Sequence, residues 1–174
     1  KAYVKTELVQ QYGAGLLSLY TDVEAYQPMM VERHALDLFL VAMDNFPSNK
    51  DLVLYSLEGC SNLLDLPDCL KAFTERQGVD STLKCMLRLP QNIDAIMLSL
   101  RLCYLTFQQD ASQIELMARE GVVAVLLFAV NHLMKEADDM ASVLQMVQLI
   151  CSNKHCCELV LKQPFVAAFA EVHE

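Results

Sequence analysis

The chain has 174 residues, of which 54% are hydrophobic and 20% charged, and its formal net charge is −9 at pH 7. This composition is typical of a globular protein and excludes an intrinsically disordered chain. The acidic balance argues against nucleic acid as a partner, because phosphate binding relies on clustered Lys and Arg.

Three features of the sequence bear on where the protein resides. The longest apolar run, from Gly121 to Met134, is shorter than the roughly 18 residues of a membrane span, so it predicts a buried helix and no membrane span. The start resembles no secretory signal, and we expect a trimmed start or a segment of a longer protein. The seven cysteines, an odd number, indicate free thiols. A cytoplasmic location is therefore expected, with a nuclear one as the alternative.

The first predicted helices define a unit of the chain. A helix is expected over about residues 2–21 from its apolar spacing. The stretch ALDLFLVAMDNF, which begins at Ala35, predicts a second helix that stops at Pro47. Asn49 then stands where an N-cap belongs and opens a longer helix over about residues 49–64. A short helix over LPDCLKAFTERQ completes the unit.

The same order of helices returns along the rest of the chain. GVDSTLKCMLRL predicts a helix before Pro90, and Asn92 opens a long helix over about residues 92–107. DASQIELMARE and SNKHCCELVLK predict further short helices, and FVAAFAEVHE begins another helix at the end. An acidic cluster opens the last long helix, where a solvated helix N-terminus is preferred over a calcium site. Its residues are Glu136, Asp138 and Asp139.

A period of 43 residues connects these units. The junctions between a short helix and the next helix, here called seams, fall at Ala35, Gly78, Gly121 and Pro164. A basic residue stands two places before each seam, at Arg33, Arg76, Arg119 and Lys162. Small residues recur in the long helices at Gly13, Ser56, Ser99 and Ser142. A period in the 40s built wholly from helical pattern is typical of an α-solenoid.

The basic residues and glycines at the seams have a structural explanation. A cation in the last turn of a helix complements the carbonyl end of the helix dipole, and a glycine just beyond can adopt positive φ. We therefore predict that a helix ends at Arg76 and Gly78, with a functional ladder of basic residues as the alternative. Cys60 and Cys103, which are also 43 residues apart, are expected to fill the core.

The stretch Cys60-Ser61-Asn62-Leu63, with Gly78 eighteen residues after Cys60, resembles the armadillo repeat. In that family a third helix ends in leucine, a variable residue, asparagine and leucine, and a short helix and a glycine follow. The resemblance covers residues 1–174. It implies an all-α fold, a right-handed α-solenoid of about four armadillo-like three-helix repeats. It also implies one segment of a longer array, with seams near 35, 78, 121 and 164. The junctions FPSN and LPQN are similar to those of armadillo arrays in large leucine-rich-repeat kinases.

The resemblance implies that the third helices line a concave groove in which partners bind. In nuclear-import receptors of this family, the groove carries a tryptophan with an asparagine four residues later. The corresponding pairs here are Gly15 and Leu19, Glu58 and Asn62, Arg101 and Leu105, and Leu144 and Gln148. Only Asn62 conforms, and the chain has no tryptophan. Binding of basic localisation peptides is therefore not expected.

The groove expected from this register combines an apolar stripe with polar anchors. Its residues are Leu54, Glu58, Asn62, Met97, Arg101, Tyr104, Leu105, Met140, Leu144 and Gln148. Methionine is frequent at surfaces that accept helices or peptides, although each methionine here has a place in the core as its alternative. The first hypothesis is a protein–protein interaction scaffold that binds a partner peptide or helix there. The second is a structural or regulatory module that packs in cis within a larger kinase, ubiquitin-ligase adaptor or cytoskeletal assembly factor.

No known catalytic or cofactor-binding motif is present, so we expect a protein that is not an enzyme and has no cofactor. The best metal candidate is CSNKHCC, with Cys151, His155, Cys156 and Cys157. Zinc needs three or four converging ligands, yet adjacent residues on a helix point about 100° apart. We expect one of Cys156 and Cys157 to face the core and the other solvent, and no metal site.

Overall fold

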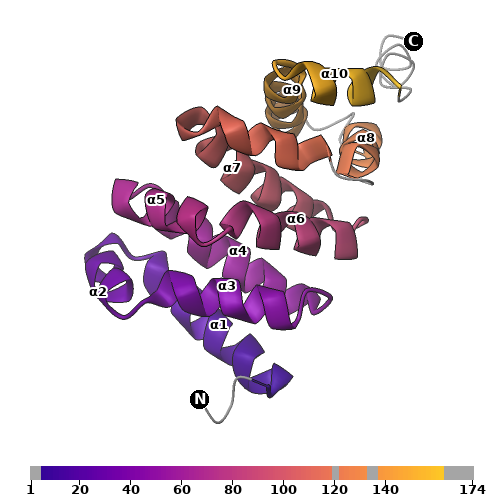
Figure 1. Ribbon diagram of the computed structural model, residues 1–174. Coiled ribbons are helices and arrows are strands. Elements are labelled where there is room, and N and C mark those ends of the chain that lie inside the picture. The colour runs from indigo at the N-terminus through magenta and orange to yellow at the C-terminus, as the bar shows by residue number, and fades with distance from the viewer. Residues whose placement is uncertain (1–4, 119–121, 133–136, 163–174) are drawn as a thin grey trace.

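The computed structural model of the chain describes residues 5–118, 122–132 and 137–162 (Figure 1). These residues form α-helices and short 3-10 helices, and no β-strand occurs among them. The fold is therefore all-α, as predicted. None of the helices in these ranges is long and apolar enough to cross a membrane.

Three kinds of helix alternate along the chain. The long helices are α1 (Glu7–Thr21), α4 (Lys50–Leu64), α7 (Ile93–Gln109) and α9 (Ala137–Cys151). The second helices are α3 (Ala35–Asn45), α6 (Gly78–Arg88) and α8 (Val122–His132). The short elements are η1 (Glu24–Tyr26), α2 (Gln27–Glu32), α5 (Pro67–Glu75), η2 (Ala111–Ala118) and α10 (Lys154–Leu161).

The order of the helices follows the sequence period. Helices α1, α4 and α7 begin 43 residues apart, and so do α3 and α6. One element differs in kind, because Ala111–Ala118 of the predicted short helix form the 3-10 helix η2 rather than an α-helix. Several predictions lie outside the described residues, namely the seams at Gly121 and Pro164, the roles of Arg119 and Glu136, and the helix over FVAAFAEVHE.

Helices of one kind pack on each other from one unit to the next. Helix α4 lies between α1 and α7, and α9 follows on α7. Helix α6 lies between α3 and α8 in the same way. Figure 1 shows the resulting layers, from α1 and α3 near the N-terminus to α9 and α10 at the other end. The apolar side chains of both rows meet in one core, in which Cys60 and Cys103 are fully buried, as predicted.

Asn49 and Asn92 begin the long helices α4 and α7, as predicted. Oδ1 of Asn49 accepts a hydrogen bond from the backbone amide of Leu52 at 3.0 Å, and Oδ1 of Asn92 accepts one from Ala95 at 3.2 Å. Asn49 also donates through Nδ2 to Oε1 of Glu7 at 2.7 Å. This second hydrogen bond ties the start of α4 to α1.

The seam at Gly78 differs from the prediction. Gly78 is the first residue of α6, and the left-handed conformation belongs to the preceding Gln77, with φ of 59°. His34 has the same conformation at the seam before it, with φ of 56°. The prediction that Gly78 supplies the positive φ is therefore wrong. What favours glycine there is space, because a Cβ would overlap the ring of Phe73.

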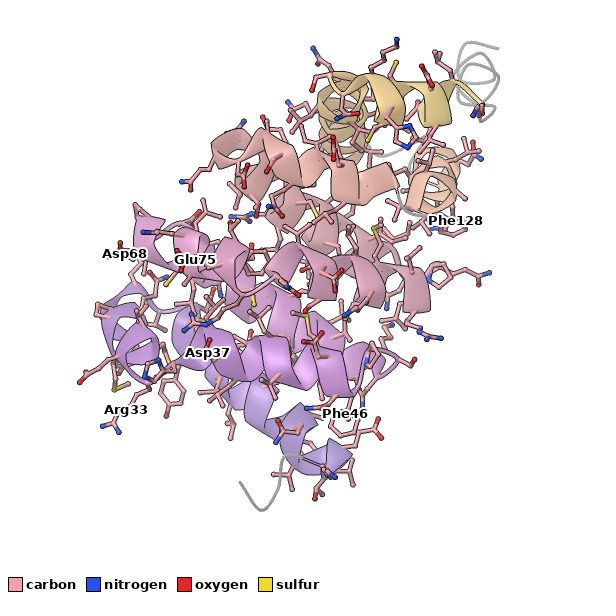
Figure 2. The ribbon with its side chains drawn as sticks, viewed as in Figure 1. Arg33, Asp37, Phe46, Asp68, Glu75 and Phe128 are labelled. Carbon is pink, nitrogen blue, oxygen red and sulfur yellow. The ribbon has the colours of Figure 1, made fainter. Side chains whose placement is uncertain are left out.

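The basic residues before two seams stand directly after the last turn of a short helix, at its C-cap position, and not within the last turn as predicted. Arg33 is the C-cap residue of α2, and Arg76 is that of α5. Arg76 also reaches α3, where its Nε lies 2.6 Å from Oδ1 of Asp37. Both side chains are partly exposed, at 46% and 32%, so the pair contributes less than about 1 kcal/mol. Figure 2 shows Arg33 pointing away from the helices into solvent.

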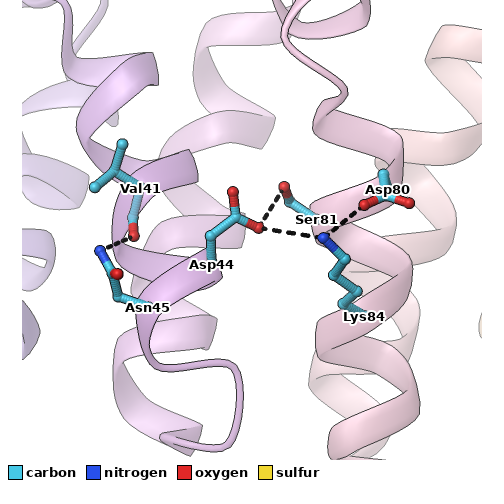
Figure 3. A network of polar contacts seen from close by, with 6 residues as sticks. All are labelled: Val41, Asp44, Asn45, Asp80, Ser81 and Lys84. Carbon is cyan, nitrogen blue, oxygen red and sulfur yellow. Dashed lines mark hydrogen bonds and ion pairs between the residues drawn. The ribbon is translucent and has the colours of Figure 1, made fainter.

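A polar contact joins the C-terminal half of α3 to α6 (Figure 3). Oγ of Ser81 donates to Oδ1 of Asp44 at 2.8 Å, and Nζ of Lys84 lies 4.0 Å from the same oxygen. Lys84 also pairs with Asp80 one turn earlier, at 2.7 Å. Because a hydrogen bond requires a defined geometry, this contact sets the register of α6 on α3.

The two N-caps differ only in the contact with α1, which gives a first prediction. Replacing Asn92 by Ala should lower the free energy of unfolding by about 1 kcal/mol, because Ala95 loses its cap. Replacing Asn49 by Ala removes the same kind of cap and also the hydrogen bonds from Nδ2 to Glu7 and Gln11 of α1, so the loss should be larger by about 0.5 kcal/mol. Urea denaturation of both variants measures the difference. Equal losses would show that these contacts with α1 add no stability.

Gly59 lies inside α4 and Gly13 inside α1. Replacing each by alanine should change the free energy of unfolding in opposite directions. A Cβ at Gly59 would overlap the ring of Phe39, whereas nothing lies within 4 Å of a Cβ at Gly13. We expect Gly59→Ala to lower the free energy of unfolding by about 1–3 kcal/mol. Gly13→Ala should raise it by about 0.5–1 kcal/mol, because alanine loses less backbone entropy.

Thermal unfolding followed by circular dichroism tests this pair of glycines, with Phe39→Leu as the background that relieves the overlap. In that background, the loss caused by Gly59→Ala should shrink. A loss of the same size with and without Phe39 would contradict the explanation.

Candidate functional site

Three adjoining hollows lie along the long helices. The first has a volume of about 510 Å³ and lies between α4, α7 and α9. The second, of about 290 Å³, lies between α1, α4 and α7. The third, of about 450 Å³, lies between α1 and α4. Because Glu58 lines all three, together they form one surface, here called the long-helix groove.

The groove brings half of the predicted site residues together. Four of them line the first hollow, and these are Glu58, Met97, Arg101 and Tyr104. Asn62 lines the second hollow, where Arg101 is found again. The register derived from the 43-residue period therefore places these side chains on one surface of α4 and α7.

The other predicted site residues lie elsewhere. Leu54, Leu105 and Met140 are half-buried and pack against the core. Leu144 is 39% exposed and Gln148 is exposed, but neither lines any of the three hollows. Met97 is half-buried and packs against the core in the same way as Met140, but it also lines the first hollow.

The sequence prediction did not include the most exposed apolar side chains of the groove. Tyr12, Leu16 and Leu19 of α1 line the third hollow and are 68%, 61% and 70% exposed. Tyr55 of α4 lies over Gly15, where an added Cβ would come within 3.3 Å of its ring. The spacing of Tyr12, Leu16 and Leu19 is that of one helix face. The sequence therefore indicates one apolar face of α1, but it does not indicate that this face is exposed.

Carboxylates dominate the charge of the groove. Glu58 is exposed, and Oγ of Ser18 donates to its Oε2 at 3.4 Å. Asp94 adds a second carboxylate to the first hollow. Arg101 is the one cation among the residues that line the three hollows. Its Nη2 lies 4.0 Å from Oδ2 of Asp65, and both side chains are more than half exposed, so this pair is weak.

Asn62, a predicted polar anchor, is engaged within the fold. Its Nδ2 donates to Oγ1 of Thr21 at 3.4 Å, and Thr21 is fully buried at the end of α1. Oγ1 of Thr21 donates in turn to the backbone carbonyl of Ser18 at 2.7 Å. Asn62 therefore holds α4 against α1. Glu58, Asp94 and Arg101, by contrast, are charged groups that the groove presents to solvent.

The CSNKHCC stretch spans the end of α9 and the start of α10. Cys156 is fully buried, and its thiol donates to the backbone carbonyl of Ile114 at 3.5 Å. Cys157 is only half-buried, so the adjacent thiols face different surroundings, as predicted. No group of three or more His, Cys, Asp or Glu side chains able to hold a metal ion occurs in residues 5–118, 122–132 and 137–162.

Burial makes the core thiols unreactive. It raises the pKa of Cys85 and of Cys103 to about 12, and it raises the pKa of Cys60 as well. The carboxylate of Asp44 adds to the rise in the pKa of Cys85. Because the thiolate is the reactive form, these cysteines stay protonated and inert at neutral pH.

A labelling experiment follows from these surroundings. At pH 8 the folded chain should react with N-ethylmaleimide at the half-buried Cys157, and more slowly at Cys151, because burial and the hydrogen bond with Cys157 raise the pKa of Cys151. Cys60, Cys85 and Cys103 should remain unmodified. Peptide mapping by mass spectrometry after a short exposure measures each site. Labelling of the core thiols should appear only in unfolding concentrations of urea. Equal rates at Cys103 and Cys157 in the folded chain would contradict the burial described above.

Comparisons with models of known protein families, with curated protein sequences and with solved structures found no match for this chain. The residues of the groove are therefore the basis for a functional proposal.

Proposed function

We propose that this chain is a protein–protein interaction scaffold that binds a partner peptide or helix in the long-helix groove. The observation that carries the proposal is the run of exposed apolar side chains Tyr12, Leu16 and Leu19 beside Glu58. Large apolar side chains in water cost free energy, and their clusters mark interaction sites. Enzymatic activity and a bound cofactor form no part of the proposal.

The proposal includes the architecture that the armadillo resemblance implies. The packing of α1, α4, α7 and α9 in one row supports an α-solenoid of about four armadillo-like repeats, right-handed and part of a longer array. In such arrays the long helices create an extended binding surface. Free cysteines throughout the described residues fit a cytoplasmic or nuclear location.

The chemistry of the groove defines the partner segment. Tyr12, Leu16 and Tyr55 favour apolar side chains at one end, and Met97 with Tyr104 favours them at the other. Glu58 lies between these ends and favours a lysine or arginine, because a charge-assisted hydrogen bond is stronger than a neutral one. The expected partner is therefore an amphipathic segment with one basic residue between two apolar anchors.

A second candidate function has support in the same surface. In a structural or regulatory module, a neighbouring domain of the same polypeptide would fill the groove in cis. The exposure of Tyr12 and Leu19 favours this too, because a free surface rarely leaves such side chains uncovered. Hydroxyl-radical footprinting of a longer natural protein would distinguish the two candidates. Protection of Tyr12 and Leu19 without any added partner would support packing in cis.

A peptide-library selection against this chain tests the scaffold proposal. Selected peptides should carry aromatic or aliphatic residues on both sides of a lysine or arginine. Their affinity should fall about tenfold in Glu58→Lys, because one attractive charge contact becomes a repulsive one. Isothermal titration calorimetry of the best peptide measures the change.

The matched control is Glu75→Lys, which makes the same charge change on α5, outside the groove. It should leave the affinity unchanged. The scaffold proposal fails if no peptide is enriched, or if Glu58→Lys and Glu75→Lys have equal effects.

A further inference from the structure

Helices α1 and α3 lie at one end of the stack (Figure 1), and their exposed apolar side chains form a second apolar surface there. It comprises Val9, Gly13 and Leu16 of α1 with Leu38 and Val41 of α3, and it is here called the end face. Its four large side chains are between 44% and 61% exposed. Val9, Gly13 and Leu38 line a hollow of about 210 Å³ between the two helices. The end face is distinct from the Glu58 region of the groove, although Leu16 lines both.

The same positions are covered in the next units. Leu52 and Gly59 of α4 stand 43 residues after Val9 and Leu16, and both are buried. Helix α3 packs on α4 there, with the ring of Phe39 against Gly59. Thus a second helix covers α4 at the place where α1 is open.

The end of α3 shows the same difference. Ser81 and Lys84 of α6 stand 43 residues after Leu38 and Val41 and contact Asp44 of the preceding second helix (Figure 3). On α3 these two positions are apolar and exposed. A helix that contacts them therefore needs an apolar residue at the place of Asp44.

The charge of Arg33, at the edge of the end face, also determines which helix fits there. Arg76 pairs with Asp37 in the second helix of its own unit, at 2.6 Å. Arg33 stands 43 residues before Arg76, is exposed (Figure 2), and has no acidic partner within the described part of the chain. An acidic residue at the place of Asp37 would complete the equivalent pair.

The packing of the later units also defines the size of the residue that must lie opposite Leu16. Phe39 lies against Gly59 in one unit, and the corresponding residues of the next are Thr82 and Leu102, both fully buried. The large and the small residue have exchanged places. Because α1 has Leu16 at this position, the residue opposite it must be small, as Thr82 is.

We propose that the end face binds an amphipathic helix of about three turns, contributed by another helical unit of the same kind. This helix lies on α1 and α3 as α3 lies on α4 and α6. It carries an acidic residue in its first turn for Arg33, a small residue opposite Leu16, and an apolar residue against Leu38 and Val41. Burial of the exposed apolar side chains drives the association, and the charge pair sets the orientation.

The chain itself contains a helix with this set of residues. In α6, Asp80, Thr82 and Leu87 occupy the acidic, small and apolar places. In α3, the small and apolar places hold Phe39 and Asp44 instead. A peptide of residues 76–90 with Cys85→Ala is therefore a probe that fits the end face. A peptide of residues 33–47 has the same length and does not fit.

Fluorescence anisotropy with the two labelled peptides tests the inference on the whole chain. The peptide of residues 76–90 should bind saturably. The peptide of residues 33–47 should bind at least about tenfold more weakly, because Phe39 would overlap Leu16 and Asp44 would be buried against apolar side chains. Val41→Asp and Leu38→Asp in the chain should each weaken binding about tenfold, with circular dichroism confirming that the variants are folded.

A charge exchange tests the predicted orientation. Arg33→Glu should weaken binding of the fitting peptide roughly two- to fivefold, and Asp80→Lys in the peptide should restore it. Glu58→Lys should have no effect, which separates this inference from the proposed function of the groove.

Four results would overturn the inference. These are the absence of saturable binding up to about 1 mM peptide, equal binding of the two peptides, binding unaffected by Val41→Asp and Leu38→Asp, and loss of binding in Glu58→Lys. Sedimentation velocity adds a fifth: a dimer of the chain that Val41→Asp abolishes but that the peptide of residues 76–90 does not displace would show that two end faces pair with each other and that neither binds the proposed helix.

Discussion

The positions of the long helices α4 and α7 depend on a close fit with the second helix of their own unit, α3 and α6. Phe39 against Gly59 is the clearest case, because the ring occupies the space that any side chain at 59 would need. In the next unit the smaller Thr82 replaces Phe39 and the larger Leu102 replaces Gly59, and both are buried. Interiors are packed as densely as organic crystals, so the sum of the two volumes is constrained more tightly than either residue.

The seams follow the same rule of shared volume. Phe73 requires Gly78 beside it, whereas one unit earlier Met30 stands in place of Phe73 and Ala35 in place of Gly78. A flexible methionine fills an irregular space and leaves room for a Cβ. The units can therefore differ in sequence while the helices keep their spacing.

Features that depend on nearby residues could be predicted from the sequence. The capping of α4 and α7 by Asn49 and Asn92 involves a hydrogen bond to an amide three residues on, so a single stretch contains all the information. The all-α class and the helix order follow from apolar spacing for the same reason. The prediction assigned the left-handed conformation to Gly78, whereas the residue that adopts it is Gln77. Position 78 needs glycine because the ring of Phe73 packs on it, and not because of its φ.

The site was predictable only where the repeat register decides which face a side chain occupies. That register brought Glu58, Met97 and Arg101 together, but it could not separate groove from core for Leu105 and Met140, since burial there depends on how the helices pack. The exposure of Leu16 depends on which helix covers α1, and its own segment does not encode that.

The packing of each helix on its neighbours also governs how the molecule responds to force. The contacts of α4 lie mainly with α1, α3 and α7, and those of α6 with α3, α7 and α8, so stability is distributed over successive layers. Tension applied at the two ends would load every interface between layers in series. Each interface would then take up part of the extension through a small change in the angle between adjacent helices. The chain would extend gradually before any single layer detaches.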